Sequence, residues 1–306
     1  GINFLDTAEM YPVNPVSKDT IGRTEEIIGN WIDANPARRG DFILATKHSG
    51  EGMAHVRDGA PISAATIAQT IEGNLRRLKT DYIDLYQFHW PNRGSYMFRK
   101  NWAYEPGGSS RQDVVENMYE CLEALQEQVD KGNIRHFGLS NESAWGTSQW
   151  LRLSDTYGLP RVQTMQNEYS LLCRLYDTDM AELSVYEDVG LITFSPLAAG
   201  LLSGKYQGDQ VPDASRRSFV NNLGGRVTPR VFNAVDAYLA VAQKHDVDPI
   251  HMALAWCHTR PFMCSAIFGA TTMDQLNHIL DGASVELSQE CLDDLNAAHK
   301  AHPMPY

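Results

Sequence analysis

The feature that most restricts the fold of this chain is a regular alternation of short strand-like runs with helix-length segments. The runs are rich in β-branched and aromatic residues, and they cover residues 2–8, 41–47, 82–90, 134–140, 162–169, 191–197 and 264–270. Strands that are almost continuously apolar and are separated by helices indicate parallel pairing, with both faces of the sheet buried. The alternation therefore predicts an α/β fold with a parallel sheet.

The segments between these runs have the apolar spacing of amphipathic helices. In one of them, Ile67, Ile71 and Leu78 repeat at helical intervals after Ser63, a residue type that favours the N-cap position. Pro249 suits the first turn of a later helix.

Among parallel α/β folds, the sequence favours a (β/α)8 TIM barrel over an open doubly wound sheet. The open sheet would carry a glycine-rich G-x-G-x-x-G loop after a strand, and the sequence contains none. No linker or repeat divides the chain, so residues 1–306 are expected to form a single barrel domain. Seven strands are one fewer than the barrel requires, and Gly1 directly precedes a strand. We therefore expect an N-terminally truncated barrel that lacks its first β-strand/α-helix unit.

The composition of the chain restricts the kinds of molecule that it is expected to bind. The net charge of −12 opposes nonspecific binding to nucleic acid or to an anionic membrane. No apolar run approaches the roughly 20 residues that cross a bilayer. Five cysteines without a C-x-x-C pair indicate reduced thiols. We therefore predict a cytoplasmic protein whose partner is a small molecule and not a nucleic acid or a membrane; whether it forms a homo-oligomer is left open.

Ionisable side chains occur where the first three predicted strands end. Asp6 lies in the first strand and Tyr11 just past it, Lys47 ends the second, and His89 lies near the end of the third. The ends of parallel barrel strands meet at the face that carries active sites. Each residue alone has an ordinary structural explanation, but together they favour one site. Because a carboxylate and an ammonium are unfavourable to bury unpaired, we expect Asp6 to pair with Lys47.

This set of side chains suits proton transfer to a carbonyl oxygen. A free tyrosine has a pKa of about 10, and a cation held against its hydroxyl lowers that pKa. Lys47 can supply the cation, Asp6 can fix the lysine, and His89 can orient the oxygen by a hydrogen bond. None of these groups attacks carbon, and a hydride from a bound nicotinamide would complete a reduction.

The motifs that carry these residues resemble those of the aldo-keto reductases. D-T-A-x-x-Y lies at 6–11, T-K at 46–47 and D-Y-I-D-L-Y-Q-F-H-W at 81–90. The resemblance continues through G-L-S-N (138–141), Q-N-E-Y (166–169), F-S-P-L (194–197), G-K-Y (204–206) and G-A-T-T-M-D-Q-L (269–276). It covers essentially the whole chain and most resembles the bacterial Tas-like and potassium-channel β-subunit-like branch.

The resemblance implies a (β/α)8 barrel that reduces aldehydes or ketones with NADP(H), with NAD(H) less favoured. It implies that Tyr11 is the general acid, that Lys47 and Asp6 tune it, and that His89 orients the carbonyl. It also implies a series of cofactor contacts: Ser140, Asn141 and Gln166 at the carboxamide, Phe194 stacked on the nicotinamide, Ser195, Leu197, Gly200, Leu202 and Lys205 along the pyrophosphate, and Gly269, Thr271, Thr272 and Gln275 at the adenosine end.

Two long loops are expected to set specificity. Residues 91–111 contain Tyr96 and Trp102 and, together with Trp90, are predicted to form one wall of an apolar substrate pocket. Residues 198–228 carry a local basic cluster that is expected to fold over the cofactor phosphates, with Lys205, Arg216, Arg217 and Arg226.

Two other function classes use the same residues. Lys47 could form a Schiff base in an aldolase-like barrel. Alternatively, the chain could be an NADP(H)-binding regulatory subunit with little turnover, as the channel β-subunit resemblance permits. The sequence favours the NADP(H)-dependent reductase, and no metal site is predicted.

Overall fold

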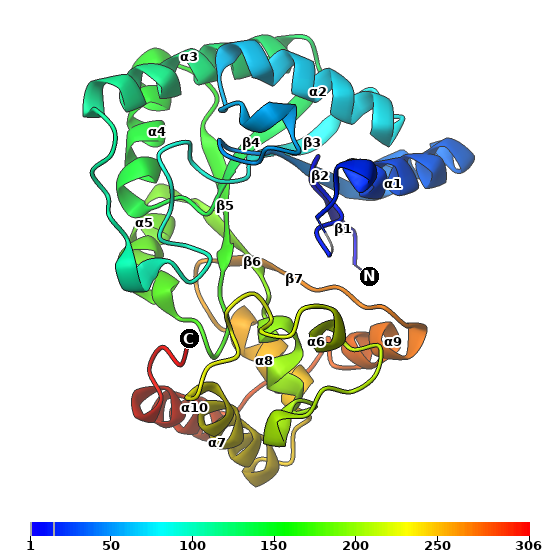
Figure 1. Cartoon of the computed structure of the whole chain (residues 1–306), viewed down its shortest axis with the longest axis vertical. Coiled ribbons are helices and arrows are strands. Elements are labelled where there is room, and N and C mark those ends of the chain that lie inside the picture. Colours follow the sequence, from blue (N-terminus) through cyan, green and yellow to red (C-terminus); the bar gives the residue numbers. More distant parts are fainter. Residues whose placement is uncertain (1, 15) are drawn as a thin grey trace. The chain divides into compact units, whose positions relative to one another are not determined.

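The computed structural model describes residues 2–14 and 16–306 (Figure 1). Its described residues form a 7-stranded sheet whose hydrogen-bonded order, β1 to β7, is the order of the chain. The strands are β1 (Phe4–Asp6), β2 (Ile43–His48), β3 (Ile83–Phe88), β4 (Ile134–Ser140), β5 (Val162–Glu168), β6 (Gly190–Phe194) and β7 (Met263–Ile267).

Helices connect the strands throughout the chain. They are α1 (Arg23–Ala34), α2 (Ala64–Leu78), α3 (Arg111–Asp130), α4 (Ala144–Tyr157), α5 (Asp179–Glu187), α6 (Arg216–Phe219), α7 (Val231–Lys244), α8 (Pro249–His258), α9 (Met273–Asp281) and α10 (Gln289–Ala301). Parallel strands in chain order with helices between them are the topology of the (β/α)8 barrel. The predicted fold class is confirmed.

The strand positions agree with the expected runs, although their ends differ. β4 spans the predicted residues 134–140, whereas β1 covers only three residues of the run at 2–8. The second strand does not end at Lys47, because His48 continues the ladder by pairing with Phe88 of β3. Because these strands are short, Tyr11 lies in the loop after β1 and His89 lies in the loop after β3.

The chain groups into two compact units, which are described separately. The first comprises Gly1–Tyr96 and Ala103–Met165, and the second comprises Met97–Trp102 and Gln166–Tyr306. The single domain expected over residues 1–306 stays a prediction.

In the first unit, α2 begins with the expected N-cap. The Ser63 hydroxyl accepts from the Thr66 backbone N–H, and the Thr66 hydroxyl accepts in return from the Ser63 N–H, which completes a capping box. The apolar stripe that contains Ile67 and Ile71 is buried. Figure 1 shows α2 (cyan) beside α3.

Helix α1 crosses the end of α2 with its backbone in close approach. A Cβ at Gly29 of α1 would lie 2.0 Å from the carbonyl oxygen of Arg77. Only glycine therefore fits at this crossing. The contact fixes α1, whose first turn also binds the loop that carries Tyr11 through the hydrogen bond from the Thr24 N–H to the Tyr11 carbonyl oxygen.

In the second unit, α7 and α10 lie side by side (Figure 1). An aromatic core holds β5 to α8, where the rings of Tyr169 and Trp256 stack with centroids 5.0 Å apart. Asp248 caps α8, and Pro249 occupies its first turn as expected. Within the described residues, no helix combines the length and the apolar character needed to cross a membrane.

Candidate active site

A buried ion pair lies at the centre of the candidate site. Lys47 Nζ lies 2.5 Å from Asp6 Oδ2, and it also donates to the backbone carbonyl oxygen of Thr7 at 2.8 Å. The Lys47 side chain is fully buried and that of Asp6 is 6% exposed. The expected pairing of Asp6 with Lys47 is therefore present in the structure, and it offsets part of the unfavourable burial of both charges.

The register of three adjacent strands brings these groups together. Asp6 of β1 pairs with Ala45 of β2, and Lys47 lies directly opposite Gln87 of β3. Gln87 Nε2 donates to Asp6 Oδ1 at 3.2 Å. The carboxylate is thus held from two sides, by an ammonium on one neighbouring strand and by an amide on the next.

Tyr11 lies beside this pair, in the loop after β1. Its ring packs against a buried cluster formed by Ala8, Met10 and Val56, and Trp90 packs against the same cluster. Lys47 Nζ lies 5.2 Å from the centre of the Tyr11 ring. The backbone carbonyl of Tyr11 accepts from the N–H of Thr24, which ties the loop to the start of α1.

His89 completes the predicted group. Its ring meets the Tyr11 ring edge-on, with centroids 5.6 Å apart. Burial lowers the pKa of His89 well below its ordinary value, and the positive charge of Lys47 lowers that pKa further. His89 is therefore a neutral imidazole near pH 7. In the described part of the chain its Nδ1 is buried and has no hydrogen-bond partner.

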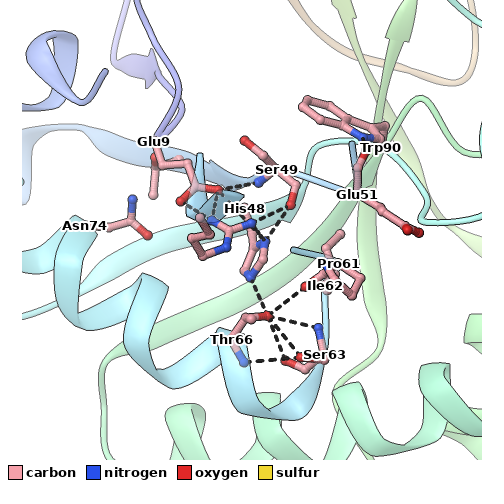
Figure 2. A network of polar contacts seen from close by, with 12 residues as sticks. Glu9, His48, Ser49, Glu51, Pro61, Ile62, Ser63, Thr66, Asn74 and Trp90 are labelled. Carbon is pink, nitrogen blue, oxygen red and sulfur yellow. Dashed lines mark hydrogen bonds and ion pairs between the residues drawn. The ribbon is translucent and has the colours of Figure 1, made fainter. Parts of the chain in front are cut away.

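A second buried ion pair fixes the loop that carries Tyr11. The Glu9 carboxylate lies 2.5 Å from Arg57 Nη1 and accepts a hydrogen bond of the same length from the Ser49 N–H. Arg57 Nη2 also donates to the Ser49 carbonyl oxygen at 2.8 Å. Figure 2 shows Glu9 and Ser49 facing one another in this network. The loops after β1 and β2 are joined by these contacts.

The same network reaches the N-terminus of α2 through His48 (Figure 2). One ring nitrogen of His48 contacts the Ser49 carbonyl at 2.8 Å and the other contacts the Thr66 hydroxyl at 3.1 Å. Desolvation lowers the pKa of His48 to about 4, although the nearby Glu9 carboxylate opposes that shift. His48 is thus a neutral structural bridge from the site to α2.

Ser140 and Asn141, predicted at the carboxamide, lie at the end of β4 in the same unit. The Asn141 side chain donates through Nδ2 to the His89 carbonyl oxygen at 2.9 Å and to Ser140 Oγ at 3.0 Å. Its own backbone has a φ of 55°, a left-handed conformation in which asparagine is favoured. Among the described residues, Asn141 Oδ1 is a buried acceptor without a donor. A group that carries N–H donors would satisfy it.

Gln166, predicted at the carboxamide with Ser140 and Asn141, lies in the second unit, as do the residues predicted at the nicotinamide ring and the pyrophosphate. Gln166 is buried in β5, and Phe194 is half-buried at the end of β6. Beyond it, the chain has positive φ values at Ser195, Ala198, Ala199 and Gly200. In this turn the N–H groups of Ala198 and Gly200 donate to the backbone carbonyl oxygens of Ser195 and Leu197 at 2.8 and 2.9 Å. Leu197 precedes the short helix Ala198–Ser203, which contains the buried Leu202.

Lys205 lies against this turn. A Cβ at Gly200 would come within 3.2 Å of Lys205 Nζ, so the glycine leaves room for the ammonium beside the backbone. No carboxylate pairs with Lys205 among the described residues; its Nζ lies 5.1 Å from the Tyr206 ring centre. It remains a cation available to a phosphate.

Two other members of the expected basic cluster are already paired. Arg217 forms an ion pair with Asp209 and donates to the backbone carbonyls of Gln210 and Asn221. Arg226 Nε lies 2.8 Å from Glu168 Oε1. Both guanidinium groups are buried and act within the second unit to hold residues 198–228 in place.

The adenosine-end residues surround the start of α9. Thr272 caps the helix by accepting from the Gln275 N–H, and Gln275 Oε1 accepts from the Thr271 N–H and hydroxyl. A Cβ at Gly269 would meet only open space. Thr271, Thr272 and Gln275 are thus joined into one exposed turn.

The three aromatic residues predicted for the substrate wall have different surroundings. The Trp90 ring lies 4.9 Å from that of His89, and its Nε1 donates to the Glu51 carbonyl (Figure 2). Tyr96 packs edge-on against Tyr104 in the same unit. Trp102 belongs to the second unit, where it is 57% exposed and lies beneath the Arg230 guanidinium.

Sequence reasoning did not identify Gln87, Glu9 or Arg57 as parts of the site. Gln87 lies inside the motif at 81–90, and its place opposite Lys47 follows only once the strand register is known. Glu9 and Arg57 are separated by 48 positions, and no local pattern relates them. The presence of glutamate two residues before Tyr11 was the one available signal.

Comparisons with known proteins show which family this chain is similar to. Residues 1–300 match the Aldo/keto reductase family. The chain is 38% identical to "Protein tas" of Escherichia coli K12, an alignment that covers all of this chain and 87% of that protein. It is 34% identical to an "Aldo-keto reductase" of Babesia bovis over 76% of this chain and 86% of that protein. It is 29% identical to a "Probable voltage-gated potassium channel subunit beta" of Arabidopsis thaliana over 93% of this chain and 79% of that protein.

Proposed function

This chain belongs to the aldo/keto reductase family of oxidoreductases, and we propose that it reduces aldehydes or ketones to alcohols with NADPH. The observation that carries the proposal is the fully buried Lys47 ammonium, held by Asp6 and lying 5.2 Å from the centre of the Tyr11 ring. A cation fixed there stabilises negative charge on the phenolic oxygen as the Tyr11 proton leaves.

The proton moves from the Tyr11 hydroxyl to the carbonyl oxygen of the substrate, which becomes the alcohol oxygen. Asp6 holds Lys47 in place, and Gln87 holds the second carboxylate oxygen. The cation is therefore positioned before the substrate arrives, so little reorganisation is needed during the reaction.

His89 orients the substrate. Because its lowered pKa keeps the imidazole neutral near pH 7, it offers one N–H donor and adds no charge. A neutral donor that meets Tyr11 edge-on can hold the carbonyl oxygen toward the phenolic hydroxyl. Trp90, which packs against both the histidine and the cluster beneath Tyr11, supplies an apolar surface for the rest of the substrate.

The residues present fit a nicotinamide cofactor. The unsatisfied Asn141 Oδ1 can accept from the carboxamide N–H group, and Ser140 lies next to it. In the second unit, Lys205 suits a pyrophosphate, and the turn of Thr271, Thr272 and Gln275 suits an adenosine. NADPH, when bound, supplies the hydride that the protein side chains cannot.

The small-molecule carbonyl substrate and the cytoplasmic location predicted from the sequence belong to this proposal. The selectivity of the site among carbonyl compounds depends on the apolar surface that surrounds Trp90. Binding of NADP(H) over NAD(H) is proposed from the family alone, because the pyrophosphate that Lys205 would bind is common to both cofactors.

The test is turnover of an aromatic aldehyde with NADPH, followed by loss of NADPH absorbance, in the wild type and in Tyr11→Phe. The variant removes only the hydroxyl, so we expect it to bind NADPH with unchanged affinity and to lose nearly all turnover. Equal turnover in both proteins would show that Tyr11 is not the acid.

Two outcomes would favour the other function classes. Tight NADPH binding without turnover of any aldehyde in the wild type would favour a cofactor-binding regulatory subunit; one relative of this chain is named as a probable potassium channel subunit beta. Borohydride trapping of a substrate adduct on Lys47 would favour Schiff-base chemistry.

A further inference from the structure

We propose that Asp248, His251 and His278 form a binding site for a divalent transition-metal ion such as Zn²⁺, where α8 and α9 meet in the second unit. One ligand atom from each residue, a ring nitrogen or a carboxylate oxygen, lies within 4.8 Å of the other two. Two imidazoles and one carboxylate are ligands that Zn²⁺ accepts, with a fourth position left for water. The site is separate from the residues of the proposed reaction.

The hydrogen bond made by His251 prepares it to bind a metal ion. Its Nε2 lies 2.6 Å from the backbone carbonyl oxygen of His278. A carbonyl oxygen can only accept, so Nε2 carries the proton and Nδ1 is the ring nitrogen left to bind a metal ion. A metal-bound histidine commonly donates its other N–H to a backbone carbonyl in this way, which fixes both its tautomer and its orientation.

Asp248 is oriented by the helix that it caps. Its Oδ1 accepts from the N–H groups of Ile250 and His251 at 2.8 and 3.1 Å. Its Oδ2 lies 3.2 Å from His278 Nε2. Within the described residues, no lysine or arginine pairs with this carboxylate. A cation therefore meets one carboxylate and two imidazole rings, and the 45% exposed side chain of His278 allows entry from solvent.

A second cluster in the same unit provides a contrast. His245, Glu290 and Asp294 also lie close together. There, however, Lys244 Nζ is 2.7 Å from Asp294 and 3.3 Å from Glu290, so an ammonium already occupies the place of a metal cation. We infer that this second cluster binds no metal ion, and it supplies a matched control.

A bound ion would stabilise the attachment of α9. Within that helix, Ile279 is the one buried residue. The ion would add a coordinate link between His278 of α9 and the first turn of α8. Helix α9 follows directly after the turn of Thr271 and Thr272, so the same link would hold that turn.

The experiment uses the full untagged chain after removal of metal with EDTA and dialysis. Zn²⁺ is titrated by calorimetry, and thermal melts are recorded with and without Zn²⁺. We expect saturable binding of one ion per chain and a rise in Tm on the order of 5 °C when Zn²⁺ is at a hundredfold excess over its Kd.

The variants separate coordination from folding. Asp248→Asn keeps the N-cap, because asparagine caps helices as well as aspartate does, but it removes the charged ligand. His278→Ala removes an exposed ring. We expect both to weaken Zn²⁺ affinity by at least about tenfold, and His245→Ala to leave it unchanged. Absence of saturable binding in the wild type, or equal affinity in wild type, Asp248→Asn and His278→Ala, would overturn the proposal.

Discussion

Lys47 Nζ lies 5.2 Å from the centre of the Tyr11 ring, and the lysine side chain is fully buried. The two residues belong to different loops and strands, so their proximity depends on the pairing of β1 with β2. It also depends on Asp6, the one carboxylate that pairs with this ammonium in the described part of the chain.

The first prediction concerns this ion pair. Asp6→Asn leaves Lys47 buried without a counter-charge, so we expect the free energy of unfolding to fall by about 3–5 kcal/mol. Urea denaturation followed by circular dichroism measures the change. Lys79→Ala is the control because it breaks an exposed pair with Asp33, which is worth less than about 1 kcal/mol. If Asp6→Asn lowers the free energy of unfolding no more than the control does, then Lys47 does not depend on Asp6 as its counter-charge.

The second prediction concerns the positioning of Tyr11. Arg57 binds both the Glu9 carboxylate and the Ser49 carbonyl, a forked contact that lysine cannot reproduce. We expect Arg57→Lys to lower kcat for aldehyde reduction by roughly tenfold to a hundredfold, because small displacements of a catalytic group reduce rate strongly. NADPH affinity, measured by fluorescence titration, should stay the same. A proportional loss of both would indicate partial unfolding instead of misplacement.

The third prediction tests the unsatisfied oxygen of Asn141. Asn141→Gly keeps the left-handed backbone and removes the amide. The variant therefore loses the proposed hydrogen bond to the carboxamide together with those to the His89 carbonyl oxygen and Ser140 Oγ. We expect NADPH affinity to fall about tenfold, equivalent to about 1.4 kcal/mol. Asn141→Ala should lose the same affinity and also some stability, because alanine is strained at positive φ. Unchanged affinity in both variants would remove Asn141 from the cofactor site.

The fourth prediction concerns the dependence of stability on pH. His48 has a folded pKa of about 4 against an ordinary value of 6.5. Between these values the unfolded chain binds a proton that the folded chain does not, so stability falls as pH decreases from 6.5 to 4. The full effect is roughly 3 kcal/mol. His89, whose pKa is lowered as well, adds a loss of the same sign.

Urea unfolding at pH 7 and pH 4.5 measures this effect in the wild type and in His48→Gln. Glutamine can still contact the Ser49 carbonyl and the Thr66 hydroxyl, but it does not titrate. We expect the variant to lose much less stability on acidification than the wild type. Equal losses in the two proteins would assign the pH dependence to other groups.

Most of the fold could be predicted from the sequence because buried parallel strands are short, apolar and bounded by helices. β4 matched its predicted residues, and the cap at Ser63 and the proline at the start of α8 were found as expected. The strand ends were less predictable. Whether His48 belongs to β2 depends on a partner in β3, and apolar character in one strand does not indicate how far its neighbour extends.

Several residues predicted for the candidate site lie together in the structure, whereas their roles stay predictions and the contacts that support them were not predicted. The ion pair between Asp6 and Lys47 followed from the unfavourable burial of single charges. Gln87, Glu9 and Arg57 contribute through contacts between distant segments, which local spacing cannot show. The basic residues of the loop at 198–228 were predicted to serve phosphates. Arg217 and Arg226 instead meet carboxylates at Asp209 and Glu168, and no motif links these partners.

The strand order has a consequence for how the chain can be made. Each strand of the sheet forms hydrogen bonds with the strand before it in the sequence. During translation, a newly synthesised strand can therefore pair with a strand that has already left the ribosome. Growth from the N-terminus then requires only the closure of one helix-containing loop at a time, which keeps the entropic barrier of each addition small. The rim that carries Asp6, Lys47 and His89 is formed at the ends of β1, β2 and β3, so translation delivers it before the C-terminal half has left the ribosome.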